Sequence, residues 1–194
     1  MKRSIEKMSL LEIAALWRLN FLSAEDISAV CMRLLEEGLD SADRRIAAFA
    51  GDSGLILSDI APHFERILVS VNGRAIGRDE AILRVLWLDL AAALAGYDLK
   101  DDVHLLLSRF ASLSEHRLVR HPRRTLDQPD GVYAEQELGL EYVYGGFYAF
   151  DDIWHLSAQE QEVAKAELLD DLRKAVGELH DHLSVVLGAE SRLT

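Results

Sequence analysis

Histidine and acidic side chains gather near the end of the sequence, where Glu178, His180, Asp181 and His182 occur within five positions. Imidazole and carboxylate groups bind zinc when three or four of them converge. On a helix, however, residues two positions apart point about 200° apart, so His180 and His182 cannot face the same ion. Glu178 and His182 share a face, but two ligands do not make a zinc site. We therefore expect no metal here, but a solvated helix end in which a histidine interacts favourably with the helix dipole.

A second group that could do chemistry consists of Asp151, Asp152 and His155, directly before a predicted helix that begins at Ser157. Carboxylates beside a histidine can support general acid–base chemistry. The same acids are also favoured next to a helix N-terminus by the helix dipole, and this structural interpretation is preferred. The sequence contains no phosphate-binding loop, nucleophile elbow or HExxH motif, so we assign no catalytic residue and no cofactor.

Positive charge is concentrated in only one segment, residues 115–131, which contains two prolines and lacks helical periodicity. Such a segment is predicted to be a loop. Arginine side chains bind phosphates and carboxylates through paired N–H groups, which makes this loop a candidate anion site. The preferred alternative is that the arginines neutralise acidic residues of the same chain, such as Glu135, Glu137 and Glu141. The candidate anion-binding residues are Arg117, Arg120, Arg123 and Arg124.

Residues 132–154 hold seven of the fourteen aromatic side chains of the chain. Enrichment in tyrosine and tryptophan is typical of recognition surfaces, although most of these rings are expected to anchor the segment to the helices. Two β-prone runs flank Gly145-Gly146, a pattern that favours a small β-hairpin near 140–150. The candidate partner-binding residues are Tyr142, Tyr144, Phe147, Tyr148 and Trp154.

The candidate residues above lie on or between predicted helices. Serine and aspartate caps and apolar residues at helical spacing recur along the chain. The helix at 79–95 is apolar almost all round and is expected at the centre of the core. Before the last helix, Ser157 and Glu160 fit a capping box. The predicted helices cover residues 4–20, 24–38, 41–51, a stretch starting near 58, 79–95, 98–113 and 157–188.

The last predicted helix carries an apolar seam with 3-4-3-4-3 spacing, which is similar to a heptad repeat. At 1.5 Å per residue the helix is roughly 47 Å long, so it could extend beyond its neighbours. Packing within its own bundle is preferred, and homodimerisation through the exposed part of the seam is the alternative. The seam residues are Leu169, Leu172, Val176, Leu179, Leu183 and Val186.

Together these patterns predict a mainly α protein, a bundle of about seven helices with a long C-terminal helix and an irregular aromatic-rich insertion. We expect residues 1–194 to form a single all-helical domain, with 114–156 as a loop or hairpin appendage packed on it.

The charge of the chain limits its partners. It has 33 acidic against 21 basic side chains, a formal net charge of −12. Binding to a phosphate backbone needs lysine and arginine, so a nucleic-acid partner is not expected. Opposite charge accelerates encounter, so a basic protein partner is compatible with this balance, as is simple solubility.

The N-terminus and the single cysteine indicate a cytoplasmic protein. Basic residues are followed by an apolar run, but Glu6, Lys7 and Glu12 interrupt it, unlike in a signal peptide. No stretch approaches the roughly 18 apolar residues of a membrane span, so no membrane association is expected. Cys31, the only cysteine, cannot form an intrachain disulfide and is expected to be a small buried apolar side chain.

Three runs, at 22–26, 34–41 and 45–51, resemble small acidic helical bacterial proteins, among them immunity-type proteins that neutralise toxins of competing strains. The resemblance covers about the first quarter of the chain and transfers no functional residue. It implies a non-enzymatic interaction or regulatory protein, such as an immunity-type inhibitor of a basic toxin. The competing hypothesis is a small hydrolase or anionic-ligand-binding domain that combines the loop at 115–131, here called the arginine loop, with Asp151, Asp152 and His155.

Overall fold

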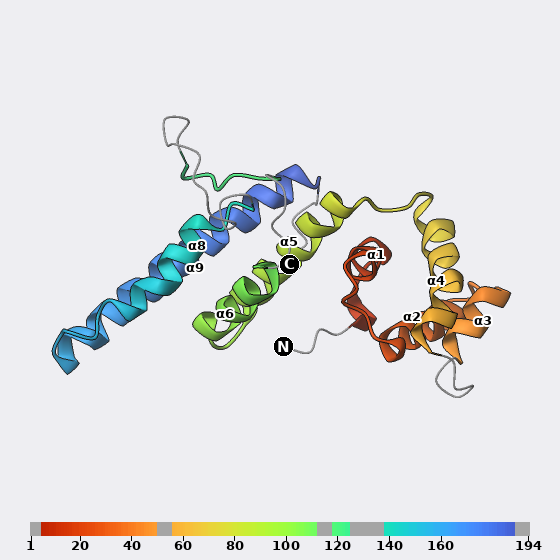
Figure 1. Ribbon diagram of the computed structural model, residues 1–194, viewed down its shortest axis with the longest axis horizontal. Coiled ribbons are helices and arrows are strands. Elements are labelled where there is room, and N and C mark those ends of the chain that lie inside the picture. The colour runs from red at the N-terminus through yellow and green to blue at the C-terminus, as the bar shows by residue number, and fades with distance from the viewer. Residues whose placement is uncertain (1–4, 50–55, 112–117, 125–137, 189–194) are drawn as a thin grey trace. The chain divides into compact units, whose positions relative to one another are not determined.

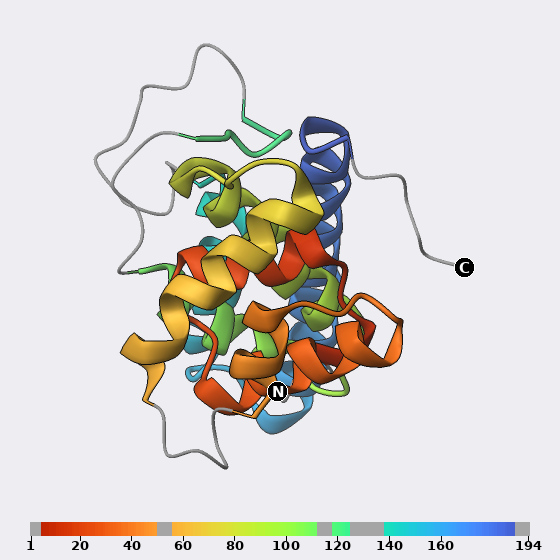
Figure 2. The ribbon, with the colours of Figure 1, turned by 90° about the vertical axis from the view of Figure 1, so that its right-hand side faces the viewer.

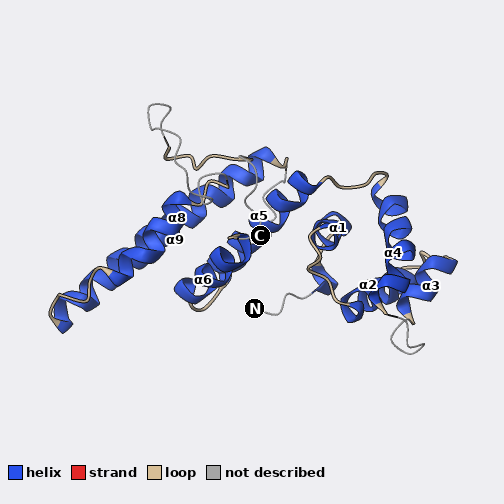
Figure 3. Ribbon diagram, viewed as in Figure 1, coloured by secondary structure: helices blue, strands red, loops and turns tan. Residues whose placement is uncertain are grey.

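The fold is mainly α, as predicted. The computed structural model describes residues 5–49, 56–111, 118–124 and 138–188. Within these ranges it contains eight α-helices, two short 3₁₀-helices and no strand (Figures 1 and 3). The helices are η1 (Ile5–Lys7), α1 (Leu10–Arg18), α2 (Ala24–Glu36), α3 (Ala42–Ala48), α4 (Leu57–Asn72), α5 (Arg78–Ala95), α6 (Leu99–Phe110), α8 (Glu141–Tyr148), η2 (Ala149–Asp151) and α9 (Ala158–Val186).

Serine caps determine where several helices begin. Ser23 accepts a hydrogen bond from the backbone N–H of Asp26, and the Asp26 carboxylate accepts one from the N–H of Ser23. Ser157 and Glu160 form the predicted capping box at the start of α9. Ser9 makes a further box with Glu12, which divides the predicted helix 4–20 into η1 and α1. Each box satisfies two backbone donors that a helix end leaves without partners.

The chain forms two compact units, residues 1–82 and 83–194, whose boundary falls within α5. In the first unit α2 packs on α3, and α4 packs on both α1 and α3. The rings of Trp17 and the buried Phe64 form an edge-to-face pair with 5.3 Å between their centroids. Cys31 is buried, as predicted, and burial raises its pKa to about 12. The prediction of one domain over 1–194 stays a prediction.

In the second unit α9 is the longest element and runs as one unbroken helix (Figure 2), with α8 along its side (Figure 1). Trp87 of α5 stacks on His180 of α9 and donates a 2.8 Å hydrogen bond to Ser184. His180 is therefore buried, and the prediction of a solvated helix end was wrong for it. Helices α5 and α6 are joined by an ion pair in which the half-buried Arg109 donates to both oxygens of the buried Asp89, at 3.0 and 2.8 Å.

The predicted β-hairpin near 140–150 was wrong, because residues 141–148 form helix α8. Gly146 is not a turn residue but a point of close approach to α9. A Cβ at this position would lie 3.3 Å from Cδ1 of Leu172. The local β preference of tyrosine and phenylalanine yields here to helix–helix packing, since β propensity depends strongly on context.

Gly139 and Gly145 form a matched test of this segment. Gly139 has a φ of +70°, and a Cβ there would lie 2.9 Å from the backbone nitrogen of His121. Gly139→Ala is therefore expected to lower the free energy of unfolding by about 2 kcal/mol or more. Gly145 lies inside α8 with open space around it, so Gly145→Ala is expected to raise that free energy by about 0.5–1 kcal/mol. Urea denaturation measures both, and destabilisation by Gly145→Ala would contradict a helix here.

Candidate functional site

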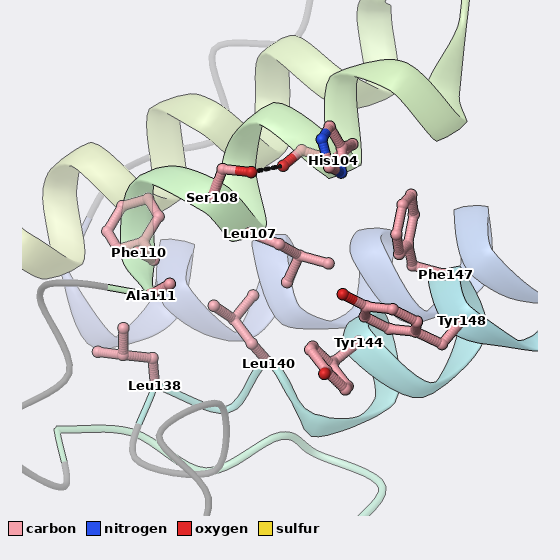
Figure 4. A pocket seen from close by; sticks show the side chains of 10 residues that line it. All are labelled: His104, Leu107, Ser108, Phe110, Ala111, Leu138, Leu140, Tyr144, Phe147 and Tyr148. Carbon is pink, nitrogen blue, oxygen red and sulfur yellow. Dashed lines mark hydrogen bonds between the residues drawn. The ribbon is translucent and has the colours of Figure 1, made fainter.

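Helices α6 and α8 enclose a pocket of about 260 Å³ (Figure 4). Three of the five predicted partner-binding residues line it, because Tyr144, Phe147 and Tyr148 are spaced i, i+3, i+4 and share one face of α8. Helix α6 supplies the opposite wall, and the segment before α8 supplies two buried leucines. The lining residues are His104, Leu107, Ser108, Phe110, Ala111, Leu138, Leu140, Tyr144, Phe147 and Tyr148.

The aromatic rings of this pocket are held by one another. Tyr148 lies 4.4 Å from Tyr144 and 5.1 Å from Phe147 between ring centroids, and the second contact is edge-to-face. The His104 ring stacks on Phe147 at 5.5 Å. The hydroxyl of Ser108 donates to the carbonyl oxygen of His104 at 2.8 Å, so it can only accept a bond from a ligand. The result is an apolar hollow with an imidazole and two phenols at its edge.

The other two predicted partner-binding residues lie elsewhere. The Tyr142 ring packs 4.8 Å from His121, and its hydroxyl lies 3.4 Å from the carbonyl oxygen of Arg123, to which it donates. Tyr142 therefore anchors the arginine loop. Trp154 lies in the turn before α9 and is 80% exposed. The five residues thus do not form one surface.

Two side chains of the arginine loop pair with carboxylates of the chain itself. Arg123 forms an ion pair with Glu178 of α9, and Arg124 lies 3.8 Å from Glu141 of α8. The Arg124 and Glu141 side chains are only 4% and 15% exposed. Arg120 is half-buried, and Arg117 lies outside the described residues. This arrangement agrees with self-neutralisation at Glu141, whereas Glu135 and Glu137 also lie outside the described residues.

His121 is a buried residue at the centre of this loop that sequence reasoning did not single out. Its Nδ1 accepts a hydrogen bond from the backbone N–H of Arg123 at 3.2 Å. Its Nε2 must then carry the proton, which it donates to the carbonyl oxygen of Ala175 at 3.0 Å. Burial lowers the pKa of His121 and raises the pKa of Glu141. The loop is thus attached to α9 by a neutral imidazole.

The site proposed for a hydrolase is not assembled. Asp151, Asp152 and His155 are exposed near the start of α9, whereas Arg123 pairs with Glu178. The 21 positions from Ser157 to Glu178 correspond to about 32 Å along a helix. Nor does any group of three or more histidine, cysteine, aspartate or glutamate side chains in the described ranges converge in a way that could hold a metal ion.

One further surface stands out, residues 151–171, which we call the acidic arm. It carries seven carboxylates and one lysine, hence a formal charge of −6, half of the net charge of the chain. None of its residues is buried, and Trp154 and Val163 are 80% and 58% exposed. Its one cation, Lys165, pairs with Glu162 at 2.8 Å. A shallow groove on the arm is lined by Leu156, Ser157, Gln159, Glu160, Val163, Ala164 and Glu167.

In the described part of the chain, no helix has both the length and the apolar character needed to cross a membrane. No protein-family profile, curated protein or solved structure matches the chain.

The buried imidazole predicts a specific pH dependence. The pKa of His121 is lower in the folded chain than its ordinary value of 6.5. As the pH falls, His121 is therefore protonated near pH 6.5 in the unfolded chain, and only at a lower pH in the folded chain. The stability contributed by His121 is therefore present above pH 6.5 and is lost as the pH falls through the folded-state pKa. His121→Gln is expected to be less stable than the parent by about 1–3 kcal/mol at pH 8, with the difference shrinking below pH 6.5.

Urea denaturation at pH 8, 6.5 and 5 measures this difference. His155→Gln, at an exposed position, is the control and is expected to change stability little at any of these values. A difference between His121→Gln and the parent that stays constant or widens toward pH 5 would contradict the neutral, buried imidazole.

Proposed function

We propose that the protein is a non-enzymatic interaction protein whose acidic arm binds a basic protein partner in the cytoplasm. One observation carries this proposal: residues 151–171 combine a formal charge of −6 with exposed apolar side chains and contain no buried residue. A surface that only solubilises the protein would not need Trp154 in the turn before α9 or Val163 on the helix to be exposed.

The two kinds of side chain support different parts of binding. Seven carboxylates attract a cationic surface over long distances and raise the association rate, an effect that salt weakens. Trp154 is of the residue type most often responsible for a large share of interface energy. Val163 lies in the groove beside Glu160 and Glu167, so a partner with an apolar ridge flanked by lysine or arginine would complement it.

A basic bacterial toxin is one partner of this kind, and the resemblance of the first quarter of the chain to immunity-type proteins supports it. In that case the arm would cover a cationic surface of the toxin. If a toxin gene lies next to the gene of this chain, the toxin that it encodes can be purified and titrated directly against this chain.

The experiment is affinity capture from lysate of the native host with the immobilised full chain at low salt, followed by titration of each purified captured protein. We expect a basic protein whose affinity falls about 30-fold with Trp154→Ala, the loss typical of a central aromatic residue. Its affinity should also fall steeply between about 50 and 500 mM salt.

A matched pair on α9 controls for the helix itself. Val163 lies in the acidic arm, whereas Val185, 81% exposed, lies near the other end of the helix. Val163→Ala is expected to weaken binding several-fold and Val185→Ala to leave it unchanged. The absence of any captured protein at low salt, or equal effects of the two substitutions, would overturn the proposal.

A further inference from the structure

The pocket between α6 and α8 differs in charge from the rest of this acidic protein. None of its ten lining residues is acidic. Lys100 lies one turn before His104 on the same face of α6, and its Nζ is 5.7 Å from the centre of the Phe147 ring. It is also 4.7 Å from the centre of the Phe150 ring. Within the described residues Lys100 forms no ion pair, so a positive charge lies beside Phe147, just outside the lining of the pocket.

The size and walls of the pocket limit its occupant. About 260 Å³ is below the roughly 300–1,000 Å³ typical of sites for drug-sized ligands, so the pocket suits a body of about one ring. Leu107 and Leu140 provide apolar walls, and Figure 4 shows the Tyr148 hydroxyl directed into the space between α6 and α8. A phenol hydroxyl and an ammonium are both hydrogen-bond donors, and both therefore suit an anionic acceptor.

We infer that this pocket binds a small carboxylate with an aromatic or branched apolar body, independently of the partner proposed for the acidic arm. The apolar body occupies the space between Leu107, Leu140 and Tyr144. The carboxylate points toward Lys100 and His104, where a fixed positive charge and the edge of the imidazole lie.

A cation, such as a lysine side chain of a partner, is the competing occupant, because aromatic rings also attract cations. The structure favours the anion for two reasons. The faces of Phe147 and Phe150 already have the ammonium of Lys100 over them. In addition, no carboxylate lines the pocket to neutralise a second cation.

The test uses three probes of nearly equal shape, phenylacetate, phenylacetamide and 2-phenylethylammonium, titrated against the full chain and followed by ¹H–¹⁵N NMR. We expect phenylacetate to bind with a Kd on the order of 1 mM or tighter, which is ordinary for a ligand of this size. The amide should bind at least about 5-fold more weakly and the ammonium more weakly still, with shifts at residues of α6 and α8.

Two variants locate the charge and the cavity. Lys100→Met is expected to reduce phenylacetate affinity about 5-fold without affecting the amide, while the matched Lys165→Met on α9 changes neither. Ser108→Trp, which fills the pocket from an exposed position, is expected to abolish binding of both probes while the circular dichroism of the protein is retained.

Three outcomes would overturn the inference. One is the absence of saturable phenylacetate binding at about 10 mM. Another is tighter binding of 2-phenylethylammonium than of phenylacetate, which would make the pocket a cation site. The third is an equal effect of Lys100→Met and Lys165→Met on phenylacetate affinity. That result would show that the affinity depends on the net charge of the protein and not on the position of Lys100.

Discussion

The second unit depends on the burial of one face of α9. Leu172, Val176, Leu179 and Leu183 are each fully buried on that face, and each such side chain contributes roughly 1.5–3 kcal/mol when removed from water. The other elements of the unit attach to this stretch at separate points. These contacts join Trp87 to His180 and Ser184, His121 to Ala175, Arg123 to Glu178 and Gly146 to Leu172.

The same constraint divides α9 into two parts with different roles. From Leu172 to Leu183 the helix builds the core, and it also supplies the backbone and side-chain groups that hold the arginine loop. From Ala158 to Asp171 it buries no residue, so its stability there depends on the Ser157 cap and on contacts with η2. Gln161 adds a 2.9 Å hydrogen bond to the carbonyl oxygen of Leu156. A helix held in this way can expose five carboxylates between Glu160 and Asp171 without burying a residue of that stretch.

Seven of the helices could be predicted from the sequence because their caps and apolar periods are local signals. Helix α8 could not be predicted, because its aromatic residues favour β-structure and Gly145-Gly146 favours a turn. The helix is stabilised by a non-local contact, the packing of Gly146 on Leu172. The buried stacking of His180 on Trp87 joins residues more than 90 positions apart and left no local signal either. For the candidate site, the i, i+3, i+4 spacing of Tyr144, Phe147 and Tyr148 was visible but was interpreted with a two-residue period.

The prediction of a homodimer through the seam stays a prediction, although Leu169 and Val186 at its two ends are exposed.

Native-state amide hydrogen exchange along α9 tests the central claim, that one half of this helix builds the core while the other is an exposed arm. Amides from 172 to 183 are expected to exchange only through large-scale unfolding, and amides from 162 to 168 at least about 100-fold faster. Uniform slow exchange along the whole helix would contradict the division, because the first half would then be held as firmly as the buried one.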